Sequence, residues 1–233
     1  MSSSSWFGWP PATMHFCEEL THGPLVQPAN AISSLAFVVV GLYLWRIVRD
    51  RDMFLLFPIS AVLVGITSFL YHASWIFFFQ VFDVSSMFML SCLLLSFNAW
   101  RLELLTERRL PYAYAGLLAV SIASMIALKG KSGEWIFAAE VAVVAASEAV
   151  LASRRAATRY EHFRWALGTF LLAFVLWILD VKEIVCAPKN HFLQGHAVWH
   201  VLNAFCFYFL YRFYRQFQAE RTSVLPRARG LDI

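Results

Sequence analysis

The sequence predicts an all-α polytopic membrane protein, folded as a bundle of seven transmembrane helices. The first observation behind this prediction is composition. Of the 233 residues, 60% are hydrophobic and 15% are charged, and the mean hydropathy is +0.60, which is too apolar for a water-soluble globular domain. The second is spacing, because the apolar residues gather into runs that are separated by short polar connections.

Seven apolar runs are expected to form the spans, since a bilayer core is crossed by about 20 apolar residues of helix. They occupy residues 30–45, 54–72, 77–100, 112–128, 136–151, 165–181 and 196–214. No fixed-period repeat divides the chain. We therefore expect one domain over residues 1–233, with residues 1–29 as an extracytoplasmic segment and residues 215–233 as a cytoplasmic tail.

Basic residues fall unevenly among the connections. Arginines follow the first, third, fifth and seventh runs, and the alternate connections carry only lysines. The arginines are Arg46, Arg49, Arg51, Arg101, Arg108, Arg109, Arg154, Arg155, Arg159, Arg164, Arg212, Arg215, Arg221, Arg227 and Arg229, and the lysines are Lys129, Lys131, Lys182 and Lys189. Because basic loops stay in the cytoplasm, the N-terminus is predicted outside and the C-terminus inside. The net charge of +4 then reflects topology and does not indicate nucleic-acid binding.

Three histidines stand at the ends of apolar runs, where an imidazole without a partner is costly. His72 closes the second run, and His196 and His200 open the seventh run, one helical turn apart on the same face. The topology brings all three to one depth near the extracytoplasmic side. Three imidazoles with an open fourth position are the ligands of a catalytic zinc, whose water has its pKa lowered to about 7. Iron, copper and nickel are less specific alternatives, whereas calcium and magnesium prefer oxygen.

Two polar residues are expected beside these histidines. Ser68 precedes His72 by one turn on the same helix face. Asp83 lies about two turns into an apolar run, where an ionised carboxylate needs a cation, and a zinc ion would supply one. Other interpretations stay open, because Ser68 can serve helix packing and Asp83 can pair with a neighbouring helix or line a transport path.

Two glutamates of the fifth run, Glu140 and Glu148, lie about two turns apart and share a helix face. They can form hydrogen bonds with a lipid headgroup or with a neighbouring helix. Glu148 is near the cytoplasmic end of the run, so we expect it to extend toward Arg154. Neither glutamate is assigned a catalytic role.

The pattern Ser68-x3-His72, Gln80-x2-Asp83, His196-x3-His200 resembles that of the alkaline ceramidases. These belong to a superfamily of seven-helix membrane hydrolases that includes the adiponectin and progestin receptors. The resemblance covers nearly the whole chain. Further matching residues are Cys17, Glu18, Asn30, Ser33, Trp177, Asp180, Ala197 and Trp199.

The resemblance implies a zinc-dependent intramembrane amidase that hydrolyses the N-acyl bond of ceramide or a similar N-acyl lipid, releasing a fatty acid and a sphingoid-type amine. The three histidines would hold the zinc. Asp83 would orient and deprotonate the zinc-bound water, then return the proton to the leaving amine. Ser68 would bond that water or steady the developing oxyanion.

Cys17 and Cys186 both fall in segments expected outside the cytoplasm, where either a disulfide or two free thiols are compatible with the sequence. The resemblance implies the disulfide. It also implies, from the animal enzymes, a calcium site near the N-terminus, of which only Glu18 is matched here. The other positions of that site are His15, Phe16, Leu20 and Gln27. They offer too few oxygens for calcium, which binds six to eight, although Glu19 and Asn30 leave another geometry open.

A second function is compatible with the same residues. A seven-helix lipid receptor or binding protein would keep the zinc for structure, as a link between the second and seventh helices. A transporter with Asp83 and the glutamates as a proton path is a third reading, although no inverted repeat supports it. The short loops and the lack of sorting signals favour a bacterial inner membrane, with the site toward the extracytoplasmic side.

Overall fold

The computed structural model describes residues 10–48, 52–128, 133–154 and 157–218. In these residues the chain forms seven α-helices and three single-turn 3-10 helices, and the only β pairing is an isolated bridge between Pro11 and Ile76. The α-helices are α1 (Pro28–Ile47), α2 (Leu56–Ser74), α3 (Phe77–Arg101), α4 (Leu110–Ala127), α5 (Gly133–Arg154), α6 (Glu161–Val181) and α7 (Gly195–Tyr214). The predicted all-α class is confirmed.

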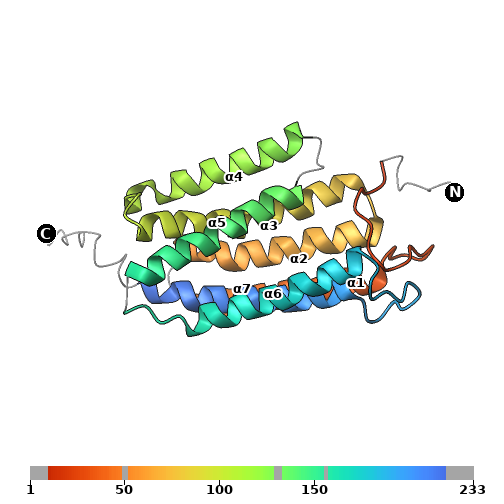
Figure 1. Ribbon diagram of the computed structural model, residues 1–233. Helices are drawn as coiled ribbons and strands as arrows, with labels where there is room; N and C mark the ends of the chain where they lie inside the picture. Colours follow the sequence, from red (N-terminus) through yellow and green to blue (C-terminus); the bar gives the residue numbers. More distant parts are fainter. Residues whose placement is uncertain (1–9, 49–51, 129–132, 155–156, 219–233) are drawn as a thin grey trace, which may run out of the picture.

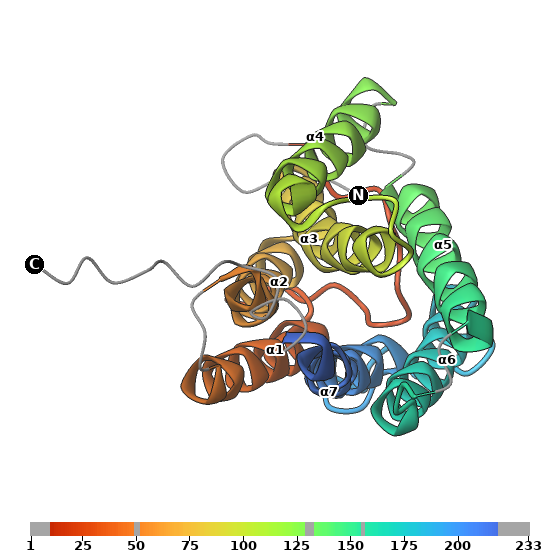
Figure 2. The same ribbon diagram turned by 90° about the vertical axis from the view of Figure 1, so that its left-hand side faces the viewer.

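The helices run side by side along a common direction (Figure 1). Viewed along the bundle, α4 lies at the edge against α3 (Figure 2). The pairs in closest contact are α1 with α2 and with α7, α6 with α7, α2 with α3, and α3 with α4 and α5. As a result, α7 is held between α1 and α6, with α2 next to α1.

Glycines allow α1 and α2 to approach closely. A Cβ atom on Gly41 of α1 would lie 3.0 Å from the carbonyl oxygen of Pro58, and one on Gly65 of α2 would lie 2.9 Å from the amide nitrogen of Val38. Small residues at a helix interface let the backbones pack directly in a membrane, where no hydrophobic effect drives helices together. The contact fixes α2, and with it the histidine at its end, against the start of α1.

A tight connection joins α2 to α3. Trp75 ends α2 with φ 56° and ψ 39°, the left-handed conformation that often terminates helices. Only Trp75 and Ile76 separate the two helices. The last turns of α2 therefore lie beside the first turns of α3, and this brings Asp83 next to the residues that precede His72.

Six helices of the described part, α1 to α6, are long and apolar enough to cross a membrane. Many of their large apolar side chains face outward, among them Ile32, Val39, Val120, Ile126, Leu171 and Leu172. The protein is thus an integral, multi-pass membrane protein. Helix α7 is less apolar than these six helices because it carries polar side chains. They include His196, His200 and Asn203, which are buried in the bundle.

The arginines of the described part lie at the end of the bundle opposite the three histidines. Helices α1, α3, α5 and α7 end there, and α4 and α6 begin there. These arginines are Arg46, Arg101, Arg108, Arg109, Arg154, Arg159, Arg164, Arg212 and Arg215. Lys182 and Lys189, in contrast, lie in the connection between α6 and α7, at the histidine end. The other residues used for the orientation, Arg49, Arg51, Lys129, Lys131, Arg155, Arg221, Arg227 and Arg229, lie outside the described residues, as does most of the expected tail.

Glu148 does not extend toward Arg154, and that prediction is wrong. It is buried and forms an ion pair with Arg101 of α3, whose side chain is also buried. The hydroxyl groups of Tyr214 and Tyr160 donate to the Glu148 carboxylate at 3.0 and 3.2 Å. A buried carboxylate needs a cation and hydrogen-bond donors beside it, and Arg101 and the two tyrosines supply them.

Glu140 accepts hydrogen bonds from neighbouring helices, which was one of the two alternatives for this residue. Ser91 of α3 and Ser121 of α4 both donate to its carboxyl group. The contacts join three helices through one buried acid in a region that water does not reach. The position is structural and lies apart from the histidines.

Candidate metal centre

The three predicted ligand residues converge in the structure. His72 lies in the last turn of α2, and His196 and His200 lie in the first two turns of α7. All three are buried, and one ligand nitrogen from each lies within 4.8 Å of the others. The Nε2 atoms of His72 and His196 are 3.1 Å apart. Zinc with bonds of about 2.0–2.1 Å in a tetrahedron places its ligand nitrogens roughly 3.4 Å from one another, and the spacing of His72 and His196 is close to this value.

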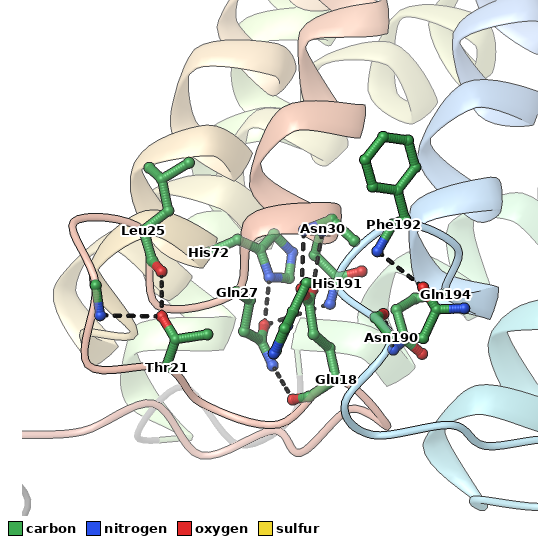
Figure 3. Close-up of polar contacts among 12 residues, drawn as sticks. Glu18, Thr21, Leu25, Gln27, Asn30, His72, Asn190, His191, Phe192 and Gln194 are labelled. Carbon is green, nitrogen blue, oxygen red and sulfur yellow. Dashed lines mark hydrogen bonds and ion pairs between the residues drawn. The ribbon is translucent and has the colours of Figure 1, made fainter.

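Neighbouring groups fix the tautomer of His72 (Figure 3). The side-chain amide nitrogen of Gln27 donates to the carbonyl oxygen of Glu18 at 3.1 Å, which sets the orientation of that amide. Its oxygen therefore faces Nδ1 of His72, at 2.8 Å, and must accept. Nδ1 carries the hydrogen, and the lone pair of Nε2 points into the cluster.

The same logic applies to His200. Ser33 of α1 donates its hydroxyl hydrogen to the carbonyl oxygen of Asn30 at 3.0 Å. Its oxygen is then the acceptor for Nδ1 of His200, 2.9 Å away. Nε2 of His200 is left with its lone pair toward the cluster. The Nε2 atoms of His72 and His200 therefore carry no hydrogen, and their lone pairs are free to bind a cation.

His196 is held by its backbone and its ring. The amide N–H of His196 donates to Oδ2 of Asp180, at the end of α6, at 3.0 Å, and Oδ1 of the same carboxylate accepts from the amide of Cys17 at 3.0 Å. Asp180 therefore acts as an N-terminal cap of α7 supplied by another helix. Gly195 permits the contact, since a Cβ there would lie 2.9 Å from the carbonyl oxygen of Leu176.

Replacing Asp180 with alanine is expected to weaken zinc binding by roughly 10-fold or more, the usual effect of losing a residue that orients a ligand. Two buried amide N–H groups would lose their acceptor, at a cost of about 1–3 kcal/mol each. Zinc titration and thermal unfolding measure both effects. Glu183→Gln, an exposed acid three residues away, is the matched control, and equal zinc affinity in the two variants would contradict the role of Asp180.

Ser68 and Asp83 complete the constellation predicted from the sequence. The hydroxyl oxygen of Ser68 is buried and lies 3.3 Å from Nε2 of His200. Asp83 lines the same cavity as Ser68, His196 and His200, and its carboxyl group interacts with the Ser68 side chain. Ser68 therefore lies between the carboxylate and the histidine cluster. The structure brings all five predicted residues together.

An N-terminal segment, residues 12–18, covers the cluster from outside. The ring of Phe16 stacks on that of His196, with centroids 3.9 Å apart. Gln80 of α3 bonds Thr13 through both its amide oxygen and its amide nitrogen. Cys17 and Cys186 form a disulfide, with Cα atoms 5.5 Å apart. Within the described residues, Nδ1 of His196 has no hydrogen-bond partner, and the stacked ring of Phe16 packs against this imidazole.

Glu18 is not part of the histidine cluster. Its carboxylate accepts from the main-chain N–H groups of Ala29 and Asn30, at 2.8 and 3.0 Å. These belong to the first turn of α1, which starts at Pro28 and has no side-chain cap of its own. Glu18 thus caps α1 as Asp180 caps α7. The sequence singled out both acids only through a resemblance, and it did not single out His191, which bonds Glu18 from a loop that carries no motif.

His196 and His200 open onto a cavity of about 440 Å³ among α2, α3, α5, α6 and α7. Its polar end contains Ser68, Asp83, His196 and His200. The rest of the wall is mainly apolar, with Leu94, Val141, Phe170, Phe174, Phe207 and Leu210 among its residues. A polar centre at one end of a hydrophobic cavity suits a ligand that has one polar linkage and a long apolar part.

Comparison with known proteins agrees with this arrangement. A family model described as ceramidase matches residues 8–227. The chain is also similar to alkaline ceramidase YPC1 of Saccharomyces cerevisiae, with 25% identity over 237 aligned positions that cover 85% of this chain and 74% of the yeast protein. The matched region includes every residue of the cluster and the segment that covers it. The chain belongs to the ceramidase family and is a membrane-embedded amide-bond hydrolase.

Proposed function

We propose that the protein hydrolyses the N-acyl bond of ceramide, or of a similar N-acyl lipid, at a zinc ion bound by His72, His196 and His200. The observation that carries the proposal is the convergence of three ligand nitrogens at the polar end of an apolar cavity. Membership of the ceramidase family supports the same substrate class. The products would be a fatty acid and a sphingoid-type amine.

The donor set fits zinc. Three imidazoles, two of them held with their Nε2 lone pairs inward, are ligands of catalytic zinc and leave one coordination position open. A zinc ion bound there supplies a Lewis acid and lowers the pKa of a water in the open position to about 7. Calcium and magnesium are disfavoured because the cluster offers nitrogen.

Asp83 is proposed as the proton carrier. Its carboxylate is half-buried, faces the cavity and lies beside the Ser68 hydroxyl. Asp83 would take a proton from the water that attacks the carbonyl carbon and would deliver it to the amine nitrogen as the C–N bond breaks. Ser68, next to His200, would donate a hydrogen bond to the oxygen that gains negative charge.

The apolar part of the cavity is proposed to hold lipid chains. Helix α5 packs against α3, and α6 packs against α7, but α5 and α6 make little contact with each other. Residues from both, such as Val141 and Phe170, line the cavity. A lipid can therefore approach the histidines between these two helices, from within the bilayer.

A receptor with a structural zinc is the other function compatible with the histidines. A metal that only links α2 to α7 needs no carboxylate facing the cavity beside it. The position of Asp83 next to Ser68 favours hydrolysis for this reason.

We also propose that the protein is a single domain with seven membrane spans, and that its N-terminus and its histidines lie on the extracytoplasmic side. The arginines of the described residues lie at the opposite end of the bundle, as expected for the cytoplasmic side. The membrane is proposed to be a bacterial inner membrane.

The test is to purify the protein in mild detergent, measure its metal content by elemental analysis, and follow release of fatty acid from a ceramide. About one zinc per chain and steady release of fatty acid and amine are expected. Removal of zinc by a chelator should stop the reaction, and added zinc should restore it. Bound zinc without turnover of any N-acyl lipid would favour the receptor and count against the proposal.

A further inference from the structure

Every oxygen of the Glu18 carboxylate is engaged by a hydrogen-bond donor. Ala29 N–H and Asn30 N–H approach Oε1 and Oε2. His191, in the loop between α6 and α7, places Nδ1 3.1 Å from Oε1 (Figure 3). Because an ionised carboxylate only accepts, Nδ1 of His191 is the donor. The buried negative charge is therefore met by the positive end of α1 and by an imidazole N–H.

Calcium does not fit this corner of the protein, although the animal alkaline ceramidases lead one to expect it near Glu18. Calcium binds six to eight oxygens. The oxygen of Gln27 is committed to His72, and N–H groups point at both oxygens of Glu18. Of the two further residues that left a calcium geometry open, Glu19 is exposed, and Asn30 offers one buried neutral oxygen that has no partner among the described residues. The N–H of His191 points at the oxygen that a cation would bind.

We propose that His191 takes the place of a cation here, so that the protein needs no calcium and His191 serves as a positioning residue for the zinc site. The connection to the zinc site is continuous. His191 bonds the Glu18 side chain, the Glu18 carbonyl oxygen accepts from Gln27, and Gln27 accepts from His72 (Figure 3). The second half of the proposal rests on the proposed zinc at His72.

The loop that carries His191 is built to present it. Oδ1 of Asn190 accepts from the amides of Phe192 and Leu193, at 3.0 and 3.1 Å, which forms a tight turn around His191. Gln194 donates to the carbonyl oxygens of Asn190 and Ala187. The side chain of His191 is 35% exposed while that of Glu18 is 0% exposed. The loop is thus held in a conformation that lets the imidazole of His191 donate a hydrogen bond to the buried carboxylate of Glu18.

Two measurements test the proposal on the full-length protein in detergent. Equilibrium dialysis with radioactive calcium should show no binding to the wild type up to about 1 mM, the range of weak extracellular calcium sites, and added calcium should leave the melting temperature unchanged. His191→Ala should lower zinc affinity by roughly 10-fold. His191→Gln, which retains an N–H donor, should recover part of that loss.

His22→Ala is the matched control, since His22 is an exposed histidine near the same N-terminal segment. Saturable calcium binding by the wild type, or a rise of its melting temperature with calcium, would overturn the proposal. Equal zinc affinity in His191→Ala and His22→Ala would overturn the positioning role. If His191→Ala fails to fold, the zinc affinity of His191→Gln and the calcium measurement on the wild type still test the two halves of the proposal. Failure of the wild type to bind zinc would instead sink the proposed function, and the calcium measurement is independent of it.

Discussion

Replacing Asp83 with asparagine is expected to reduce the rate of ceramide hydrolysis by about 100- to 10,000-fold while the protein keeps its zinc. Asparagine has nearly the shape of aspartate and can still bond Ser68, but it cannot take and return a proton. Loss of a general acid–base group typically costs a factor of this size. The rate of fatty-acid release and the zinc content, measured on the same sample, separate catalysis from metal binding.

The asparagine variant should also retain its substrate, since binding precedes proton transfer. Mass spectrometry of co-purifying lipids would then identify the N-acyl lipid directly. Glu161→Gln, an exposed acid at the other end of the bundle, is the control and should hydrolyse ceramide at the wild-type rate. An Asp83→Asn protein with more than about a tenth of wild-type activity would exclude Asp83 as the proton carrier.

Replacing His196 with alanine is expected to remove both the zinc and the activity. Only two imidazoles remain, and the affinity for zinc should fall by more than the roughly 10- to 100-fold typical of losing a residue that merely supports a ligand. The melting temperature should also fall, because the metal no longer links α2 to α7 and a ligand that binds only the folded state stabilises it. Elemental analysis and thermal unfolding measure these effects.

His162→Ala is the appropriate control, because His162 lies in the first turn of α6, at the opposite end of the bundle. Wild-type protein stripped of zinc should melt at the temperature of the His196→Ala variant, which distinguishes the loss of metal from the loss of the side chain. A variant that retained stoichiometric zinc with His196 absent would show that the ion sits elsewhere.

Much of the fold could be predicted from the sequence because a bilayer imposes strict rules on length and polarity. Apolar runs of helical length can cross it only as helices, so the class followed from composition and from the spacing of the apolar runs. The prediction failed for the partner of Glu148. Arg154 is near in sequence, but Arg101 is near in space, and the pairing of α3 with α5 is a tertiary contact that hydropathy does not encode.

The convergence of the histidines was accessible for a similar reason. His72 and His196 stand at ends of apolar runs that the topology places at one depth, and helical periodicity adds His200. The groups that orient these rings were less accessible. Gln27 and His191 lie in polar segments without periodicity, and their partners are set by how the loops fold over the helix ends.

The disulfide between Cys17 and Cys186 has a consequence for the order in which the protein matures. The two cysteines are 169 residues apart in the chain, and ribosomes build the chain from its N-terminus. Cys17 is therefore made early and must wait until six helices have been synthesised before its partner exists. The disulfide, and the stacking of Phe16 on His196, can form only then. Nascent chains would have their helices in the membrane before they can hold a metal, and the hydrolase would become active at the last stage of its biogenesis.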